Sequence, residues 1–360
     1  MFRISRSLGF AFLIGFTLLV TGCAGGIPGL APTPTDTAAP TETPQPTETP
    51  TPTATALPPV GLLLLPDGAD PNLADQLQSF LAERIPAQGM RFQVRSTLRA
   101  TDFDRDEVRW VIALAPYADL GAMVAIAPQT RFLAVGFNNL EPAANLTVVT
   151  RPEDWYVQQA FMAGYLGMVI TPDWRSGMIR VNTPEGALAA EAFYNGSLFF
   201  CSSPSGNLAC YARYAPVYGY PIIAYGEPET TADEWPGVGR YMLGQYVETI
   251  FVSPEVKSEQ LLRYLAQEEV EIIGTGAPPS DLSARWVASL EYDIFQGFQD
   301  YWPEFVAGAE GQLVEVPLVI THVNPELLSP GRQQFVEQML ADVQAGYIVM
   351  VDEEENVNNP

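Results

Sequence analysis

Basic side chains are scarce in this 360-residue chain, which has 18 lysines and arginines against 42 aspartates and glutamates. The formal net charge is therefore 18 − 42 = −24, with Lys257 as the only lysine and His322 as the only histidine. Phosphate backbones and anionic lipid surfaces repel so acidic a chain, and we expect no nucleic-acid partner. A lysine Schiff base or a histidine pair is nearly excluded, and a zinc site would have to combine one histidine with carboxylates.

Motifs of common enzyme classes are also missing. The sequence contains no G-x-S-x-G turn, no Walker loop and no G-x-G-x-x-G after a predicted strand. The segment Gly237-Val238-Gly239-Arg240 lacks the third glycine of a dinucleotide-binding turn. We therefore expect no catalytic residue, no cofactor and no metal, and we interpret the chain as a protein that is not an enzyme.

The N-terminus has the shape of a secretory signal peptide, which we assign to residues 1–22. Arg3 and Arg6 precede a run of about 15 mostly apolar residues, which is too short for a membrane span. The segment 19–23, which reads LVTGC, resembles a bacterial lipobox. That resemblance implies cleavage before Cys23, a lipid on its sulfur, and export. The alternative is an ordinary signal peptide with an incidental cysteine.

Two further cysteines, Cys201 and Cys210, remain if Cys23 carries a lipid. They bracket residues 202–209, a stretch dense in turn-forming side chains. In an exported protein such a pair predicts a disulfide that closes a short loop and adds about 2–3 kcal/mol to the free energy of unfolding. Two free buried thiols are the alternative.

Residues 23–59 predict a disordered linker. From residue 28 onward they are almost entirely proline, threonine, alanine, glutamate and glutamine. Such a segment buries too little apolar surface to fold, and its prolines favour an extended spacer of up to roughly 100 Å. Residues 352–360 are expected to form an acidic tail.

Short apolar runs alternate with helix-period stretches from Val60 onward, which predicts βαβ units and parallel sheets. The strands exceed the usual number in one sheet, so we expect an α/β fold with two lobes. In the long helix at 155–170, Gly164 and Gly167 would allow a close approach to a sheet. The expected strands are 60–65, 92–95, 110–114, 132–135, 146–149, 178–181, 222–225, 249–252 and 271–273, and the expected helices are 73–85, 155–170, 257–268 and 285–301.

Four segments resemble motifs of one family in their order and spacing. They are an aromatic helix core at 158–166, a strand start at 176–179, a returning helix at 286–301, and a closing strand, helix and strand at 311–313 and 335–348. This order is similar to that of the BMP (basic membrane protein) family of substrate-binding lipoproteins, which have the type I periplasmic binding protein fold. The resemblance spans nearly all of residues 60–351.

The resemblance implies two Rossmann-like lobes with parallel sheets, joined by a hinge that the chain crosses three times. The ligand would lie in the cleft at the carboxyl ends of the strands. We place the first lobe at 60–172 plus 284–312 and the second at 173–283 plus 313–351.

The function that the family implies is solute capture for an ABC importer. The chain would be lipid-anchored on the extracytoplasmic face of the bacterial plasma membrane, close its lobes on a small polar solute such as a nucleoside, and deliver it to a permease. The alternative is a ligand-sensing or surface-interaction receptor of the same fold without transport. Two departures favour that alternative: the loop 66–72 has no aromatic residue, and the loop 274–279 lacks the family's ligand-holding aspartate.

Ligand-binding residues are expected just after strand ends. Asp67 follows the first strand and suits ligand hydroxyls, or it caps the next helix, for which Asp70 is the better candidate. Phe137 and Asn138 suit stacking and edge recognition of a planar ligand, or they form a plain turn. Thr275 lies in a Gly-Thr-Gly loop and would donate to the ligand, or it belongs to a simple strand-to-helix turn.

Two aromatic residues complete the predicted site. Trp155 opens the long helix and would stack on a base, with packing in the core as the alternative. Tyr194 belongs to an aromatic-rich stretch between residues 193 and 225. That stretch would form one wall of the cleft, or it would fill the core of the second lobe.

Overall fold

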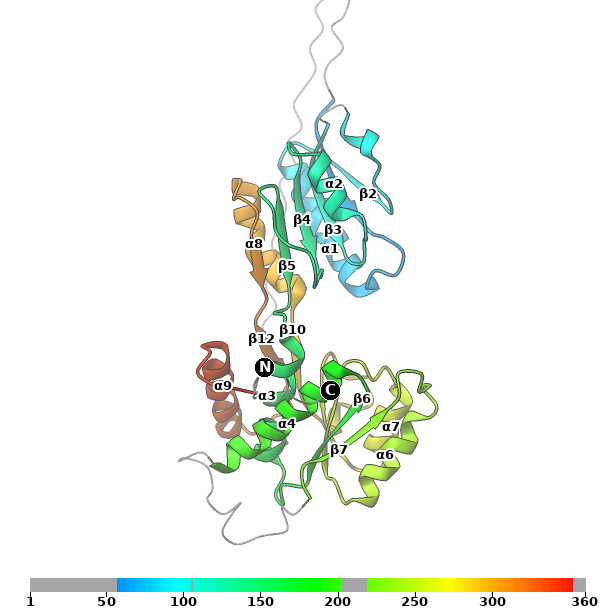
Figure 1. The fold of residues 1–360 in the computed structure, drawn as a ribbon, viewed down its shortest axis with the longest axis vertical. Helices are drawn as coiled ribbons and strands as arrows, with labels where there is room; N and C mark the ends of the chain where they lie inside the picture. The colour runs from blue at the N-terminus through cyan, green and yellow to red at the C-terminus, as the bar shows by residue number, and fades with distance from the viewer. Residues whose placement is uncertain (1–56, 105–106, 203–218, 352–360) are drawn as a thin grey trace, which may run out of the picture. The chain divides into compact units, whose positions relative to one another are not determined.

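Each of two six-stranded sheets forms the centre of one α/β lobe (Figure 1). The computed structural model describes residues 57–104, 107–202 and 219–351. The signal peptide, Cys23, nearly all of the linker, the side chains of Cys201 and Cys210, and the acidic tail lie outside the described residues. Within the described ranges, no helix has the length and apolar character that a membrane span requires.

The first sheet contains only parallel pairs, in the order β11-β5-β4-β3-β1-β2. Helices α1 (Pro71–Ala87) and α8 (Ile294–Ala307) cover one face, and α2 (Leu120–Ile126) covers the other. Its strands are β1 (Val60–Leu64), β2 (Arg91–Arg95), β3 (Val108–Leu114), β4 (Arg131–Val135), β5 (Leu146–Thr150) and β11 (Leu313–Glu315).

The second sheet has the order β12-β10-β9-β8-β6-β7 and is parallel except for the pair β10–β12. Helices α6 (Trp235–Gly244) and α7 (Glu259–Gln267) pack on one face, whereas α3 (Trp155–Ile170) and α9 (Pro330–Gln344) pack on the other. Its strands are β6 (Ser176–Val181), β7 (Ile222–Gly226), β8 (Thr249–Val252), β9 (Glu271–Gly274), β10 (Trp286–Tyr292) and β12 (Leu318–Thr321).

Most of helix α3 is buried because α4 (Pro184–Ser202) packs closely against it on the same sheet, where Phe193 of α4 stacks on Phe251 of β8 (Figure 1). A Cβ on Gly164 would lie 2.0 Å from the carbonyl oxygen of Phe193, and a Cβ on Gly196 would lie 2.0 Å from that of Phe161. Gly164 therefore permits a helix–helix crossing, not the expected approach to a sheet. Gly167 does face the sheet, since its Cβ would lie 3.2 Å from the Cβ of Ser176.

The chain passes between the two lobes three times, but not at the boundaries expected from the sequence. It crosses between β5 and α3, between β10 and α8, and between β11 and β12. Helix α3 and strand β10 were both expected in the first lobe and belong to the second. Strand β11 was expected in the second lobe and pairs with β5 in the first.

The expected helix at 285–301 is a strand followed by a helix. Residues of β10 pair with β9 on one side and β12 on the other, so they continue the buried sheet. Asp293 then caps α8, because its Oδ1 accepts a hydrogen bond from the backbone N–H of Gln296 at 2.9 Å. The closing strand expected at 345–348 is also absent, since α9 ends at Gln344 and the next residues form a turn and irregular backbone.

Candidate functional site

A cavity of ≈ 210 Å³ lies at the carboxyl ends of strands from both sheets, and we name it the strand-end cavity. Parallel strands end at one edge of a sheet, which is where ligands bind in open α/β folds. Helix α3 adds two side chains from its first turns, and α8 adds its first residue. The lining residues are Gly136, Arg151, Trp155, Gln159, Pro254, Thr275, Glu291, Tyr292 and Ile294.

Arg151 lies over the aromatic face of Trp155, with the guanidinium carbon 3.9 Å from the ring centre. The Tyr292 ring meets the Trp155 ring edge-on at 6.5 Å, and its hydroxyl donates to the Trp155 carbonyl oxygen at 3.1 Å. Burial raises the pKa of Tyr292, so the hydroxyl stays protonated and remains a donor. These contacts hold the guanidinium in one orientation at the cavity.

Burial also lowers the pKa of Arg151, while Tyr292 and Glu255 act in the opposite direction. An arginine side chain keeps its charge in proteins, so the cavity contains a partly desolvated cation. The interaction of such a cation with an anionic partner is stronger than it would be in bulk water.

Gln159, which lines the cavity, contains an unpaired polar atom. Its side-chain Nε2 donates to the carbonyl oxygen of Leu290 at 2.6 Å, and the residue is 3% exposed. Its Oε1 is buried and has no hydrogen-bond partner among the described residues. A buried acceptor without a donor costs about 1–3 kcal/mol, which a bound ligand with an N–H or O–H group would offset.

Glu291 brings a carboxylate to the same cavity. Its side chain is 23% exposed and lies 3.6 Å from Nδ1 of His322. Oε1 of Glu291 also accepts a hydrogen bond from the hydroxyl of Thr321. The cavity thus holds one cationic and one anionic side chain, from opposite lobes.

Buried hydrogen bonds connect the loop that carries Thr275 to strand β10. Ser289 is fully buried, and its hydroxyl donates to the Gly276 carbonyl oxygen at 2.6 Å. The same hydroxyl accepts from Nε1 of Trp286 at 2.9 Å. This chain of bonds connects the loop after β9 to the adjacent strand β10.

Of the six residues predicted to bind ligand, Trp155 and Thr275 line the strand-end cavity. Phe137 does not line it and packs against the core beneath α2, although the preceding Gly136 does line the cavity. Asn138 is exposed, and its Oδ1 accepts from the Thr150 hydroxyl at 3.1 Å.

Asp67 and Tyr194 lie away from the strand-end cavity. Asp67 is exposed in the turn after β1, and Asp70 caps α1 by accepting from the Leu73 N–H at 2.9 Å. Tyr194 is 44% exposed on α4. Neither residue lines this cavity.

Seven of the nine lining residues were not anticipated from the sequence, and four of these have polar side chains: Arg151, Gln159, Glu291 and Tyr292. Arg151 follows β5 directly, so the strand-end rule that selected Thr275 also applies to it. Gln159 and the adjacent Gln158 are the two amide residues in a mostly apolar helical run, which is a usable signal. Glu291 and Tyr292 were missed because the sequence predicted a helix at 285–301, whereas these residues belong to strand β10.

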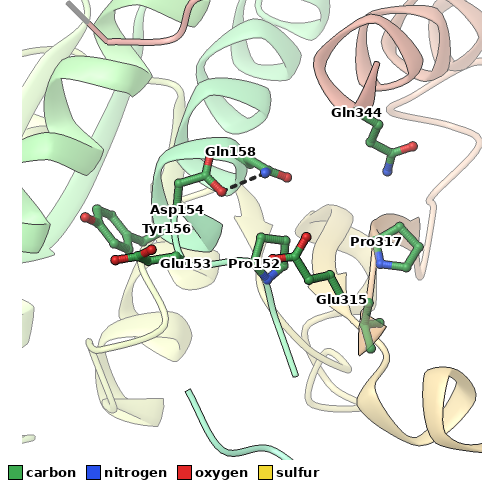
Figure 2. A pocket seen from close by; sticks show the side chains of 9 residues that line it. Pro152, Glu153, Asp154, Tyr156, Gln158, Glu315, Pro317 and Gln344 are labelled. Atoms are coloured by element: carbon green, nitrogen blue, oxygen red, sulfur yellow. Dashed lines mark hydrogen bonds between the residues drawn. The ribbon is translucent and has the colours of Figure 1, made fainter. Parts of the chain in front are cut away.

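A second hollow of ≈ 680 Å³ lies against two of the segments that cross between the lobes. Figure 2 shows Glu153, Asp154 and Glu315 around it, with Gln344 projecting from α9. Its amide groups have protein partners: Nε2 of Gln158 donates to Asp154 at 2.8 Å, and Nε2 of Gln344 donates to the Leu318 carbonyl oxygen at 2.7 Å. We assign the site to the strand-end cavity because the unpaired buried acceptor belongs to Gln159, which lines that cavity.

Comparison with known proteins establishes the fold. No family model and no curated protein matches this chain. A structure described as an ABC transporter solute-binding protein from Conexibacter woesei DSM 14684 is 16% identical, with a TM-score of 0.52, and the match covers 81% of this chain and 99% of that one.

Two further structures are similar at comparable levels. An ABC transporter solute-binding protein from Aeropyrum pernix K1 is 12% identical, with a TM-score of 0.53 over 81% of this chain and 93% of that one. A transcriptional activator of the comK gene from Bacillus halodurans is 10% identical, with a TM-score of 0.53 over 79% and 96%. These likenesses and the two sheets confirm the predicted fold class, a two-lobed type I periplasmic binding protein fold. Membership of the BMP family stays a prediction.

Proposed function

We propose that this protein captures a small polar solute in the strand-end cavity and delivers it to the permease of an ABC importer. The observation that carries the proposal is the buried, unpaired Oε1 of Gln159 in a cavity formed by strand ends of both sheets. Such an atom favours a bound partner because the cost of its burial is recovered only on binding.

The crossing segments supply a mechanism for capture. Three short connections join the lobes, and a ligand that contacts both lobes stabilises their closed arrangement. Arg151 follows a strand of the first sheet, whereas Thr275 follows one of the second. The two similar structures described as ABC transporter solute-binding proteins support the same role.

A lipid on Cys23 would hold the protein at the extracytoplasmic face of the plasma membrane. The linker would then let the two lobes reach solute at a distance while they stay near the permease. Replacement of Cys23 by alanine should move the protein from the membrane fraction to the soluble fraction and abolish incorporation of labelled palmitate. A variant that remains on the membrane and labelled would refute the anchor.

A receptor without transport is the second candidate function. It is favoured by the similarity to a structure described as a transcriptional activator. Adjacent genes for a permease and an ATPase would support transport, whereas their absence would support sensing. Both functions require the same ligand-binding event in the strand-end cavity.

Thermal unfolding of the purified full chain with a panel of nucleosides, sugars and amino acids tests binding. A ligand at 100 times its Kd adds about 2.7 kcal/mol to the free energy of unfolding. For a protein of this size that corresponds to a rise of about 5–10 °C in the unfolding midpoint. A folded protein whose midpoint no solute raises would overturn the proposal.

Two aromatic variants locate the site. Trp155→Leu should remove the ligand-induced rise in the midpoint because it removes the platform under Arg151. Tyr194→Leu is the matched control, since Tyr194 lies on α4 and does not line the cavity. Loss of binding in the control, with Trp155→Leu unaffected, would place the site elsewhere.

A further inference from the structure

The strand-end cavity holds charges of opposite sign, and this narrows the class of solute. We infer that the ligand is a free amino acid, with its carboxylate on Arg151 and its ammonium group facing Glu291 and Gln159. The inference rests on the proposed function, since it names the solute of the same cavity.

Arg151 is equipped to hold a carboxylate. Among the described residues it forms no hydrogen bond and no ion pair, and stacking on Trp155 is its main fixed contact. Five other arginines form ion pairs with carboxylates, so acidic partners are plentiful in this chain: Arg91, Arg95, Arg175, Arg263 and Arg285. A guanidinium that is oriented but unpaired presents its fork of N–H donors to a ligand, and that fork matches a carboxylate in bidentate geometry.

Two acceptors in the cavity match an ammonium group. Oε1 of Gln159 is buried without a donor, and the carboxylate of Glu291 is partly exposed at the end of β10. An ammonium group has three donors and no acceptor, so its chemistry matches acceptors of both kinds. A neutral hydroxyl could serve Gln159 but would bring no positive charge to Glu291, whose neighbour His322 is charged only when it is protonated.

The volume of the cavity agrees with a ligand of this size. A space of ≈ 210 Å³ has room for a solute of the size of one amino acid. A zwitterion has no net charge, so its capture is compatible with the strongly acidic chain.

Binding of the 20 L-amino acids to the full chain, measured by calorimetry, tests the inference. The primary amide of each amino acid that binds is measured beside it, together with uridine, adenosine, ribose and glucose. We expect at least one amino acid to bind and its amide to bind about 100-fold more weakly, as expected when one partner of a desolvated charge pair is removed.

Matched arginine variants test whether Arg151 causes the preference for the amino acid over its amide. Arg151→Gln should weaken binding of the amino acid about 100-fold and abolish the difference between acid and amide. Arg131→Gln is the control, because Arg131 is stacked in the same way on Phe305, at 4.4 Å, and does not line the cavity. If Arg151→Gln fails to fold, the comparison of acid with amide on the parent protein decides.

The outcomes separate the two proposals. Binding of a nucleoside or a neutral sugar that Arg151→Gln leaves unchanged would overturn the amino-acid inference and retain the proposed function. Equal affinity for an amino acid and its amide would also overturn the inference. A parent protein that binds no small solute would overturn both.

Discussion

Replacement of Gly164 by alanine tests whether α3 and α4 cross in backbone contact. The new Cβ would lie 2.0 Å from the carbonyl oxygen of Phe193, whereas carbon–oxygen contacts are ordinarily about 3.3 Å or longer. The helices would have to separate by about 1.3 Å. Gly196 meets α3 with equal closeness from the other side, so little adjustment is available.

We expect Gly164→Ala to lower the free energy of unfolding by about 3 kcal/mol, at the upper end of the range for overpacked cores. The midpoint of thermal unfolding, followed by circular dichroism, should fall by about 6–12 °C. Gly237→Ala makes the same chemical change at an exposed position of α6, where a Cβ meets nothing within 4 Å, and should slightly raise the midpoint. Equal midpoints for the two variants would refute the close crossing.

Three further substitutions probe buried polar groups. Ser289→Ala should lower the free energy of unfolding by about 1–3 kcal/mol in urea titrations, because the buried N–H of Trp286 loses its acceptor; an unchanged midpoint would contradict this. Burial raises the pKa of the Glu271 carboxyl group above its value in the unfolded chain. The free energy of unfolding therefore falls as the pH rises from the unfolded pKa through the folded pKa. Glu271→Gln should therefore be more stable than the parent at pH 7 and equal to it below about pH 4, and a difference that persisted in acid would exclude this cause. Asn145→Asp should cost about 2–4 kcal/mol, since Nδ2 of Asn145 donates to three backbone carbonyl oxygens at 3.0, 3.1 and 3.3 Å; a thermal midpoint equal to that of the parent at pH 7 would refute this.

The layered fold was predictable because its strands are short apolar runs with helical periods between them. The helix at 155–170 was predicted with the bounds that α3 has. The structure of residues 285–301 was not predicted correctly, because a buried strand and an amphipathic helix meet there without a break in hydrophobicity. Asp293 and Gln296 mark the boundary, and a cap that spans three residues is a weak signal in one sequence.

The site was predictable only in part. The strand-end rule selected Thr275, and the position of Trp155 at a helix start was also informative. The role of Gln159 depends on its contact with Leu290, which lies 131 residues away along the chain. No local pattern reveals that one amide nitrogen is satisfied at such a distance while its oxygen is not.

The three crossings have a consequence for the order in which the protein folds. The first sheet is complete only when β11 pairs with β5, and 162 residues of the chain intervene between Thr150 and Leu313. Neither lobe corresponds to one continuous segment, so no simple truncation isolates either of them. Because contacts between distant residues form slowly, the addition of β11 to the edge of this sheet is expected to be late. During synthesis or transport of the chain from its N-terminus, the first sheet can therefore be completed only after β11 has emerged.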